Sequence, residues 1–382
     1  MTHPKTDTGP LTAVAMSGGL DSSVTAWLLA REGDRRVVGL SMLLWNKENE
    51  VRRGRCCGAL DVGDAKRVAQ QSGIPHYTLR MDEEFQEKVV DPFVNDYLSG
   101  RTPIPCVACN TWLKFDLLLE RARAFGADRI ATGHYARIVE GPEGYELHRA
   151  VDQEKDQSYY LFELTQDQLA RSAFPLGDMA KPQVRELARE AGLIVAEKPE
   201  SMEICFVERG VQQFVEQQVT QRPERFPEAK VEAPAEVVTD DGQSLGESSA
   251  PYYRYTVGQR RGLGVSGNSP LYVLQVQPEE NRLVVGDAEK LMAPGLVGER
   301  LHFIQPGKDD PGVFSETGDE LRATVRIRSH HPGASCTVRR LEGDRARIRF
   351  DEPQRGVTPG QAAVLYDGSR VVGGCWIAEA GE

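Results

Sequence analysis

The chain has 382 residues, of which 40% are hydrophobic and 27% charged, and its formal net charge at pH 7 is −11. This is the composition of a globular protein with room for two or three domains, and the acidic charge disfavours nonspecific binding to nucleic acid. No run approaches 18 apolar residues and the first ten residues are polar, so we expect no membrane span and no secretory signal, while seven cysteines fit a reducing cytoplasm.

The first part of the chain alternates short apolar runs with amphipathic segments. The apolar runs predict strands at 11–16, 35–45, 75–81 and 127–136, and the amphipathic segments predict helices at 24–33, 61–73, 83–100 and 110–126. Pro92 is expected to kink the third of these helices. Alternation of this kind predicts an α/β fold with a doubly wound parallel sheet, which binds ligands beyond the carboxyl ends of its strands.

The composition changes after about Phe206, where a stretch rich in Pro and Glu is followed by short strands and turns. We expect a hairpin at 269–287, a meander at 324–353 and a second hairpin at 357–380. This pattern predicts a small mixed central domain and a C-terminal β-barrel. The expected domains are 1–206, 207–293 and 294–382.

Charge is concentrated in one part of the expected barrel. Residues 321–350 contain eight arginines against two acids, with His330 and His331 in the same stretch. Two interpretations stay open: alternating arginines on the solvated face of β-strands, or a surface that contacts phosphates.

The string AMSGGLDSS follows the first predicted strand and opens the first predicted helix. Glycines there let the backbone approach a phosphate, and a helix N-terminus offers N–H groups and the positive end of its dipole. Asp21 is an acid placed where phosphates would lie, so we expect Mg²⁺ between them. The ending GK[ST] is missing, which excludes a Walker A loop.

A second motif, TPIPCVACN, places Cys106 and Cys109 two residues apart. By itself this spacing fits a disulfide, half of a zinc site, a pair of iron–sulfur ligands, or a nucleophile with a neighbouring thiol. Asn110 is a plausible cap for the helix that follows, and it would place Cys109 near a helix N-terminus, which favours the thiolate.

The SGGxDS string after the first strand resembles the PP-loop ATP pyrophosphatases, which have an adenine nucleotide α-hydrolase-like fold. Within that group the chain is similar, over nearly its whole length, to the bacterial tRNA 2-thiouridylases. The likeness rests on ordered motifs along the chain: AMSGGLDSS, GRTPIPCVACNTWLKF, ATGHYA, KDQSYYLFEL, FPLGDMAKPQVRELA, SMEICFVERG, YTVGQRRGLG, PLYVLQV and VTPGQAAVLYDG.

The resemblance implies roles for individual residues. The positions that match the nucleotide site are Ala15, Met16, Ser17, Gly18, Gly19, Leu20, Asp21, Ser22, Met42 and Gly133. The positions that match tRNA contacts are Ile104, Pro105, Cys106, His134, Lys155, Asp156, Gln157, Arg328, Ser329 and Gln361, the first three of them around the target base. Cys109 falls at the nucleophile and Cys205 at the cysteine that carries a persulfide, and the two are expected to form a transient disulfide.

The sequence departs from the family pattern at three places. The stretch that usually reads Asn-Pro-Asp is Ile104-Pro105-Cys106, so a thiol replaces a carboxylate. Ser329 replaces a tyrosine, which removes an aromatic ring from the tRNA contact, and Cys375 replaces a glycine.

Two hypotheses for the cysteines remain open. In the favoured one, Cys109 and Cys205 form the working redox pair and Cys106 is an accessory thiol. In the alternative, Cys106, Cys109 and Cys205 ligate an iron–sulfur cluster with one open iron. A zinc site would need a fourth ligand, for which His134 is conceivable.

The resemblance therefore implies an ATP- and Mg²⁺-dependent transfer of sulfur to the 2-position of the wobble uridine of tRNA. The expected partners are the tRNA and a sulfur donor protein, and no association with a membrane is expected. Two other classes are weighed against it. A PP-loop ligase or amidating enzyme for a small molecule needs neither the thiol pair nor the basic barrel. A nonenzymatic sulfur or cluster carrier does not need the ATP loop.

Overall fold

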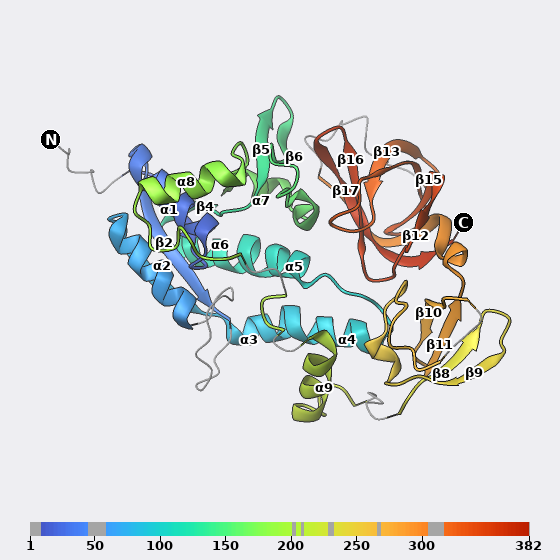
Figure 1. Ribbon diagram of the computed structural model, residues 1–382. Helices are drawn as coiled ribbons and strands as arrows, with labels where there is room; N and C mark the ends of the chain where they lie inside the picture. Colours follow the sequence, from blue (N-terminus) through green and yellow to red (C-terminus); the bar gives the residue numbers. More distant parts are fainter. Residues whose placement is uncertain are drawn as a thin grey trace.

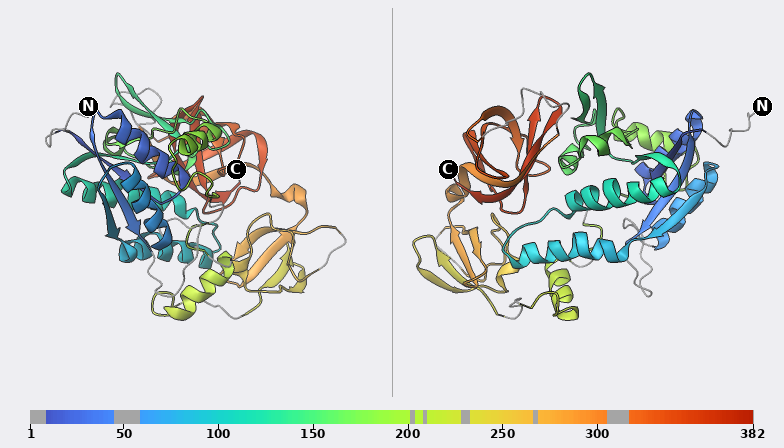
Figure 2. Two further views of the ribbon diagram at one scale, coloured as in Figure 1. Left: turned by 60° about the vertical axis from the view of Figure 1, so that its left-hand side comes forward. Right: turned by 180° about the vertical axis from the view of Figure 1, so that it is seen from behind.

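The protein has three parts: an α/β domain, a small central sheet and a β-barrel (Figure 1). The computed structural model describes residues 9–44, 59–200, 204–207, 210–227, 233–265, 269–304 and 317–381. Figure 2 shows the central sheet and the barrel side by side at one end of the molecule, with the α/β domain at the other. The expected fold class is confirmed.

The sheet of the α/β domain has five parallel strands in the order β3-β2-β1-β4-β7. The strands are β1 (Leu11–Ala15), β2 (Arg36–Leu43), β3 (His76–Arg80), β4 (Ala127–Ala131) and β7 (Ser172–Ala173). Strand β1 lies in the middle, paired with β2 on one side and β4 on the other. The chain order reverses at β1, and such a switch point is where open parallel sheets bind ligands.

Helices cover both faces of this sheet. On one face α1 (Leu20–Glu32), α2 (Ala59–Gln71) and α8 (Lys181–Glu190) share a core with the buried side chains of β1 and β2. On the other face a larger core packs α6 (Leu118–Ala124) and the helical run from α3 (Asp82–Phe85) to α4 (Asp91–Leu98) against the same strands. The sheet is doubly wound because both of its faces are apolar.

Two long helical runs each contain a π-helical segment. The first consists of α3 (Asp82–Phe85), η1 (Gln86–Val90) and α4 (Asp91–Leu98), and Pro92 lies in the first turn of α4. Pro92 has no backbone N–H to donate within the helix. It lies in the first turn of α4, directly after the π-helical segment η1, and proline is tolerated at such a position.

The second run consists of α5 (Pro105–Ala108), η2 (Cys109–Leu117) and α6. It crosses the middle of the molecule with its α5 end toward the barrel (Figure 1). The helix predicted to begin at Asn110 therefore begins at Pro105, at a position for which proline is pre-organised.

The central part combines one helix with a four-stranded sheet of order β10-β11-β8-β9. Its elements are α9 (Val211–Gln221), β8 (Glu236–Thr239), β9 (Ser244–Glu247), η4 (Tyr252–Arg254), β10 (Tyr272–Gln277), β11 (Arg282–Gly286) and η5 (Ala288–Leu291). The antiparallel β10–β11 pair is the hairpin predicted at 269–287.

The barrel closes because β12 pairs with both β15 and β17. Its strands are β12 (Met292–Phe303), β13 (Glu320–Arg326), β14 (Ala334–Arg340), β15 (Arg345–Arg355), β16 (Ala362–Asp367) and β17 (Arg370–Ala380). The predicted meander is β13–β15 and the predicted tail hairpin is β16–β17. Alternate residues of β15 point inward and are buried, as expected for a half-buried strand.

A hairpin of the α/β domain extends the barrel sheet. It is formed by β5 (Ala136–Gly141) and β6 (Gly144–Arg149), and β6 pairs with β17 through His148 and Arg370. Downstream of it, η3 (Ser158–Leu161) and α7 (Gln166–Ala170) lead back to β7. The barrel is thus joined to the α/β domain by backbone pairing as well as by side chains.

Candidate functional site

The turn between β1 and α1 is packed so closely against neighbouring backbone that two positions require glycine. Gly18 has a φ of +73°, and a Cβ there would lie 2.0 Å from the carbonyl oxygen of Asp61. A Cβ on Gly133 would lie 2.7 Å from the backbone nitrogen of Ser22. Side chains are therefore excluded from both positions, and the two predicted nucleotide glycines line the same loop.

The hydrogen bonds of this turn leave the start of α1 available. Gly19 is the N-cap residue and provides no side-chain cap. The Ser22 hydroxyl accepts a hydrogen bond from the Ser17 backbone N–H at 3.1 Å, which folds the turn on itself. A helix that begins without a side-chain cap presents backbone N–H groups and a positive dipole end, and these bind phosphate.

Asp21 is held by groups that the sequence did not reveal. Lys181 Nζ lies 2.7 and 2.9 Å from its two carboxylate oxygens, and the Tyr135 hydroxyl donates to it at 3.0 Å. Lys181 also lies 3.1 Å from Glu200, which in turn binds Lys155 at 2.8 Å. The acid in the loop is therefore compensated by a lysine from the start of α8.

A second lysine, Lys198, fastens the turn from the other side. Its Nζ donates to the Gly18 carbonyl oxygen at 2.9 Å, to Asp61 at 2.5 Å and to Asp64 at 2.7 Å. The Asp61 side chain is only 3% exposed. Lys198 thus contacts the loop directly at Gly18, whereas Glu200 reaches it only through Lys181, and Cys205 follows five residues after Glu200 along the chain.

The remaining predicted nucleotide residues surround this turn. Met16 donates its backbone N–H to the Leu40 carbonyl at 2.8 Å, and Ser41 donates its hydroxyl to the Met16 carbonyl at 2.6 Å. Met42 is buried in β2, two positions beyond Leu40. Ala15 ends β1 and Leu20 begins α1, so residues 15–22 of the predicted set span the turn between these two elements.

The cysteine helix differs from the prediction at its start. Because the helix begins at Pro105, Cys106 lies in its first turn and Cys109 in its second, so the expected place of Cys109 at the helix start is wrong. Asn110 is not a cap: it is buried, donates to the Tyr160 carbonyl at 3.0 Å and accepts from Lys114 at 2.9 Å. The field of a helix terminus fades within one turn, so it acts on Cys106 more than on Cys109.

Cys109 and Cys205 are both half-buried against the same hydrophobic core, whereas Cys106 is exposed. The segment of Cys205 is anchored by the buried ring of Phe206, which packs edge-on against Phe85 and Phe93 at centroid distances of 5.4 and 5.1 Å. In the described parts of the chain, no group of three or more His, Cys, Asp or Glu side chains is arranged to hold a metal ion.

Tyr160 joins the cysteine helix to the barrel and was missed by the sequence reasoning. Burial raises the pKa of its hydroxyl, a hydrogen bond with Ser329 opposes this rise, and the adjacent Cys106 adds to it. The tyrosine that the family has at 329 is absent here, and the hydroxyl of Tyr160 lies against the serine in its place. The signal that could have found it is the YY pair inside the KDQSYYLFEL motif.

A hollow of about 360 Å³ lies beside the start of the cysteine helix. Ile104 and Pro105 line it together with two tryptophans, Trp112 and Trp376. Cys106 does not line it. The structure therefore separates the three residues predicted around the target base, because successive positions of a helix point in different directions.

His134 and Gln157 have structural surroundings. His134 is buried between Phe115 and Phe174, and its Nδ1 lies 2.6 Å from the Thr132 hydroxyl. Burial, with Lys114 nearby, lowers its pKa well below 6.5. Gln157 accepts a hydrogen bond from the Tyr135 backbone N–H at 3.0 Å. Their predicted contact with tRNA stays a prediction, and His134 has little surface to make it.

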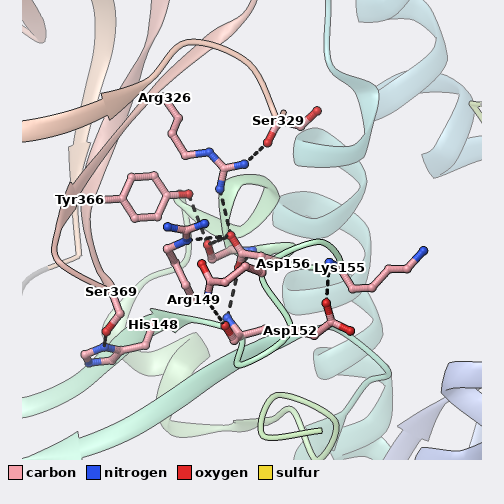
Figure 3. A network of polar contacts seen from close by, with 12 residues as sticks. His148, Arg149, Asp152, Lys155, Asp156, Arg326, Ser329, Tyr366 and Ser369 are labelled. Atoms are coloured by element: carbon pink, nitrogen blue, oxygen red, sulfur yellow. Dashed lines mark hydrogen bonds and ion pairs between the residues drawn. The ribbon is translucent and has the colours of Figure 1, made fainter. Parts of the chain in front are cut away.

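Asp156 lies at the centre of the contact between the α/β domain and the barrel (Figure 3). Its side chain is 0% exposed and accepts from Arg326 of the barrel at 2.9 Å and from Arg149 at 3.3 Å. Ser158 also donates to it, and Arg326 donates to the His331 carbonyl at 3.0 Å. A buried carboxylate with these partners holds two domains together and has no surface for RNA in this structure.

The barrel residues predicted to contact tRNA lie close to the cysteine helix. Gln361 donates to the Thr102 carbonyl at 2.8 Å, and the Thr102 N–H donates to the Pro359 carbonyl at 2.8 Å, so the segment before the cysteines is fixed to the barrel. Arg328 is exposed and donates to the Arg355 carbonyl at 3.3 Å. On the outer face of the barrel, Arg339 lies directly opposite Arg347.

The fold and the site define a class: a nucleotide-binding HUP-domain protein with an appended barrel. The family model "tRNA methyl transferase HUP domain" matches residues 11–209, a PRC-barrel model matches 226–287 and an aminomethyltransferase β-barrel model matches 295–377. No helix among the described residues is long and apolar enough to cross a membrane.

Relatives match the chain from end to end. It is 47% identical over 376 residues to the tRNA-specific 2-thiouridylase MnmA of Solibacter usitatus, which covers 96% of this chain and 98% of that one. It is 48% identical over 382 residues to the protein of the same name from Geobacter metallireducens, which covers 95% of each. The chain belongs to the tRNA-specific 2-thiouridylase family.

Proposed function

We propose that this protein is an ATP-dependent tRNA 2-thiouridylase that places sulfur on the 2-position of the wobble uridine. The observation that carries the proposal is that a glycine-lined, uncapped phosphate loop and a half-buried cysteine pair occur in one chain whose full length matches tRNA-specific 2-thiouridylases. A small-molecule ligase needs no such cysteines, and a sulfur carrier needs no phosphate loop.

The loop residues bind ATP and orient its phosphates. Backbone N–H groups at the start of α1 face the phosphates, and Gly18 and Gly133 allow the backbone around the turn to pack closely. The 2-oxygen of the uridine attacks the α-phosphorus, and the bond to pyrophosphate breaks. The adenylated oxygen is then a good leaving group, which an unmodified carbonyl oxygen is not.

Sulfur transfer uses the two half-buried cysteines. The terminal sulfur of a persulfide on Cys205 attacks the 2-carbon, and AMP leaves with the oxygen. The thiolate of Cys109 then attacks Sγ of Cys205, which releases the sulfur on the base and forms a Cys109–Cys205 disulfide. An external thiol reduces this disulfide, and a sulfur donor protein restores the persulfide.

The tRNA partner is bound by the barrel and by the segment before the cysteines. Arg328 is exposed at this junction and is suited to a backbone phosphate, and Gln361 fixes the approach to Ile104 and Pro105. The target base must leave the anticodon stack, which costs a few kcal/mol and is easiest in a single-stranded loop.

Two inorganic groups belong to the proposal in different ways. Mg²⁺ with ATP would neutralise phosphate charge, and Asp21 is the carboxylate in the loop that could hold it. An iron–sulfur cluster would require Cys106, Cys109 and Cys205 as soft thiolate ligands. Cys106 is exposed and has a different environment from the other two, so we favour the persulfide route.

Release of pyrophosphate from ATP tests the first half of the proposal. It is expected only when tRNA with a wobble uridine is present. Release without tRNA, or with a small amide acceptor, would point to a ligase, and no release under any condition would point to a carrier.

Serine substitutions test the second half. Cys109→Ser and Cys205→Ser should abolish thiolation, whereas Cys106→Ser should keep most of it, because a disulfide needs two partners only. Serine keeps the volume but is a poor nucleophile and a poor soft-metal ligand. Equal loss of activity and iron in all three variants, with an intact circular dichroism spectrum, would replace the persulfide route by the cluster.

A further inference from the structure

Two arginines from different domains meet at one tyrosine. Tyr272 begins β10 of the central sheet, and Arg355 ends β15 of the barrel. The guanidinium carbon of Arg355 lies 5.3 Å from the centroid of the Tyr272 ring. Arg260, from the loop between η4 and β10, lies near enough to the same tyrosine side chain to lower the pKa of its hydroxyl.

These two guanidinium groups differ from most others in the molecule. Among the described residues neither Arg260 nor Arg355 forms an ion pair with a carboxylate, and both are exposed. By contrast, Arg282 of the same central sheet pairs with Glu236 at 3.1 Å, and Arg322 of the same barrel pairs with Asp351 at 2.6 Å. In a chain of net charge −11, two unneutralised cations on one side chain form a local site of the opposite sign.

The pKa of the Tyr272 hydroxyl is lowered by the positive charge of these arginines. Arg260 lowers the pKa of Tyr272 most, burial opposes this effect, and Arg355 adds a further lowering, so that the net shift is downward. The phenol oxygen therefore lies where negative charge is stabilised. It is also a donor in its neutral form, and a phosphate oxygen can accept from it.

A third arginine extends the cluster toward the sulfur-transfer site. The carbonyl of Arg355 accepts a hydrogen bond from Arg328 at 3.3 Å. Arg328 follows β13 in the chain and precedes Ser329, whose side chain binds Tyr160 beside Cys106. The cluster is thus linked to the cysteine helix through consecutive contacts.

We propose that Arg260, Arg355 and Tyr272 form a binding site for one phosphate group of the RNA backbone. The inference rests on the proposed function, which supplies the RNA, and it assigns residues that lie outside the motif positions matched above. Two guanidinium groups and a phenol hydroxyl present several N–H and O–H donors to one anion, as phosphate recognition by arginine requires.

RNA fits this site better than an acidic protein surface does. The site is a small cluster next to Arg328, not a broad basic face, and it holds an aromatic ring among its cations, which suits a nucleotide backbone with stacked bases. Because its donors come from both the central sheet and the barrel, a bound phosphate would also link these two domains across the junction seen in Figure 2.

Equilibrium binding of a tRNA with a wobble uridine, measured over a range of salt concentrations, tests the proposal on the full-length protein. Arg260→Ala and Arg355→Ala should each weaken binding about tenfold, the loss expected for one charged hydrogen-bond partner. The double variant should lose less affinity for tRNA than the product of the two single fold-losses, because both arginines hold the same phosphate. The slope of its log affinity against log salt concentration should change by about one unit, the value for one phosphate contact.

Arg322→Ala is the matched control, since it removes an exposed arginine of the same barrel whose guanidinium is bound by Asp351. It should leave affinity and slope unchanged. Tyr272→Phe keeps the ring against Arg355 and should weaken binding by less than either arginine variant. Thermal unfolding confirms that each variant is folded.

The outcomes separate this inference from the function on which it rests. Wild-type protein that does not bind tRNA would refute the proposed function. Wild-type binding with an unaltered double variant would refute the phosphate site alone, and so would an equal loss in Arg322→Ala. Unaltered tRNA affinity with weaker binding of an acidic sulfur donor would assign the cluster to a protein partner and overturn the proposal.

Discussion

Lys181 Nζ lies 2.7 and 2.9 Å from the two carboxylate oxygens of Asp21, although the two residues are 160 positions apart in the chain. This contact joins the start of α8 to the phosphate loop at the start of α1. The negative charge of Asp21 in the loop is thereby compensated by a cation from another helix.

Replacing Lys181 by methionine should weaken ATP binding by about tenfold or more, because the carboxylates of Asp21 and Glu200 then face the phosphates without a cation. Calorimetric titration with ATP and Mg²⁺ measures the effect. Lys155→Met is the control, since Lys155 pairs with Glu200 at 2.8 Å and has no bond to Asp21. Equal effects of the two variants would contradict a specific role for Lys181.

Asp21→Asn should keep the fold and stop tRNA-dependent release of pyrophosphate, because a carboxylate ligand for Mg²⁺ is lost. The measurement is release at saturating Mg²⁺. Near-normal release there would show that the carboxylate serves only its contacts with Lys181 and Tyr135.

Lys198→Ala should lower the free energy of unfolding by about 3 kcal/mol, the low end of the range for breaking a buried ion pair, because Lys198 itself is 16% exposed. The cause is the Asp61 carboxylate, which stays buried without its cation. Adding Asp61→Asn should recover much of the loss. Denaturant titration of both variants is the test, and a double variant less stable than the single one would refute this explanation.

Asp156→Ala should destabilise the protein by about 3 kcal/mol, because Arg326 then stays buried between the domains without its carboxylate. The salt dependence of tRNA binding should not change, since the Asp156 side chain has no exposed surface. Lys155→Ala, at the neighbouring position and partly exposed, is the comparison. A stable Asp156→Ala protein with weakened tRNA binding would restore the RNA contact that the family resemblance implies.

Stability should fall as the pH drops below about 6.5, and His134 should contribute to the fall. Burial holds the pKa of His134 well below 6.5 in the folded protein, whereas the unfolded chain has the ordinary value. The unfolded state therefore binds more protons below pH 6.5, which costs the fold roughly 1.4 kcal/mol per pH unit for one histidine. The contribution of neutral His134 is complete above that pH.

The variant His134→Gln should show a shallower decline between pH 6.5 and 5, measured by the denaturant midpoint. His76 and His331 also have pKa values lowered by burial, so part of the decline should remain. Glu200 does not interfere in this range: burial raises its pKa, but the hydrogen bonds from Lys155 and Lys181 outweigh this and lower it below 4.5. An unchanged decline in the variant would contradict the assignment.

The fold class and the glycine-rich turn before α1 could be predicted because both depend on short-range chemistry. Strands such as β1 are apolar runs, and the helix after Ser17-Gly18-Gly19 follows from turn residues next to an amphipathic segment. The start of the cysteine helix was misplaced at Asn110, since asparagine is a common cap. The structure uses Asn110 for a bond to Tyr160 instead, and Pro105 opens the helix.

The glycine-rich turn and the helix that follows it could be read from local sequence, because a glycine and a helix start act where they stand in the chain. Only the tertiary structure decided the charges around them. Lys181 and Lys198 reach the loop from distant positions, and Asp156 is buried by an arginine of another domain. The reason is physical: an ion pair between remote residues has no local pattern, and its partners are chosen by how the domains pack.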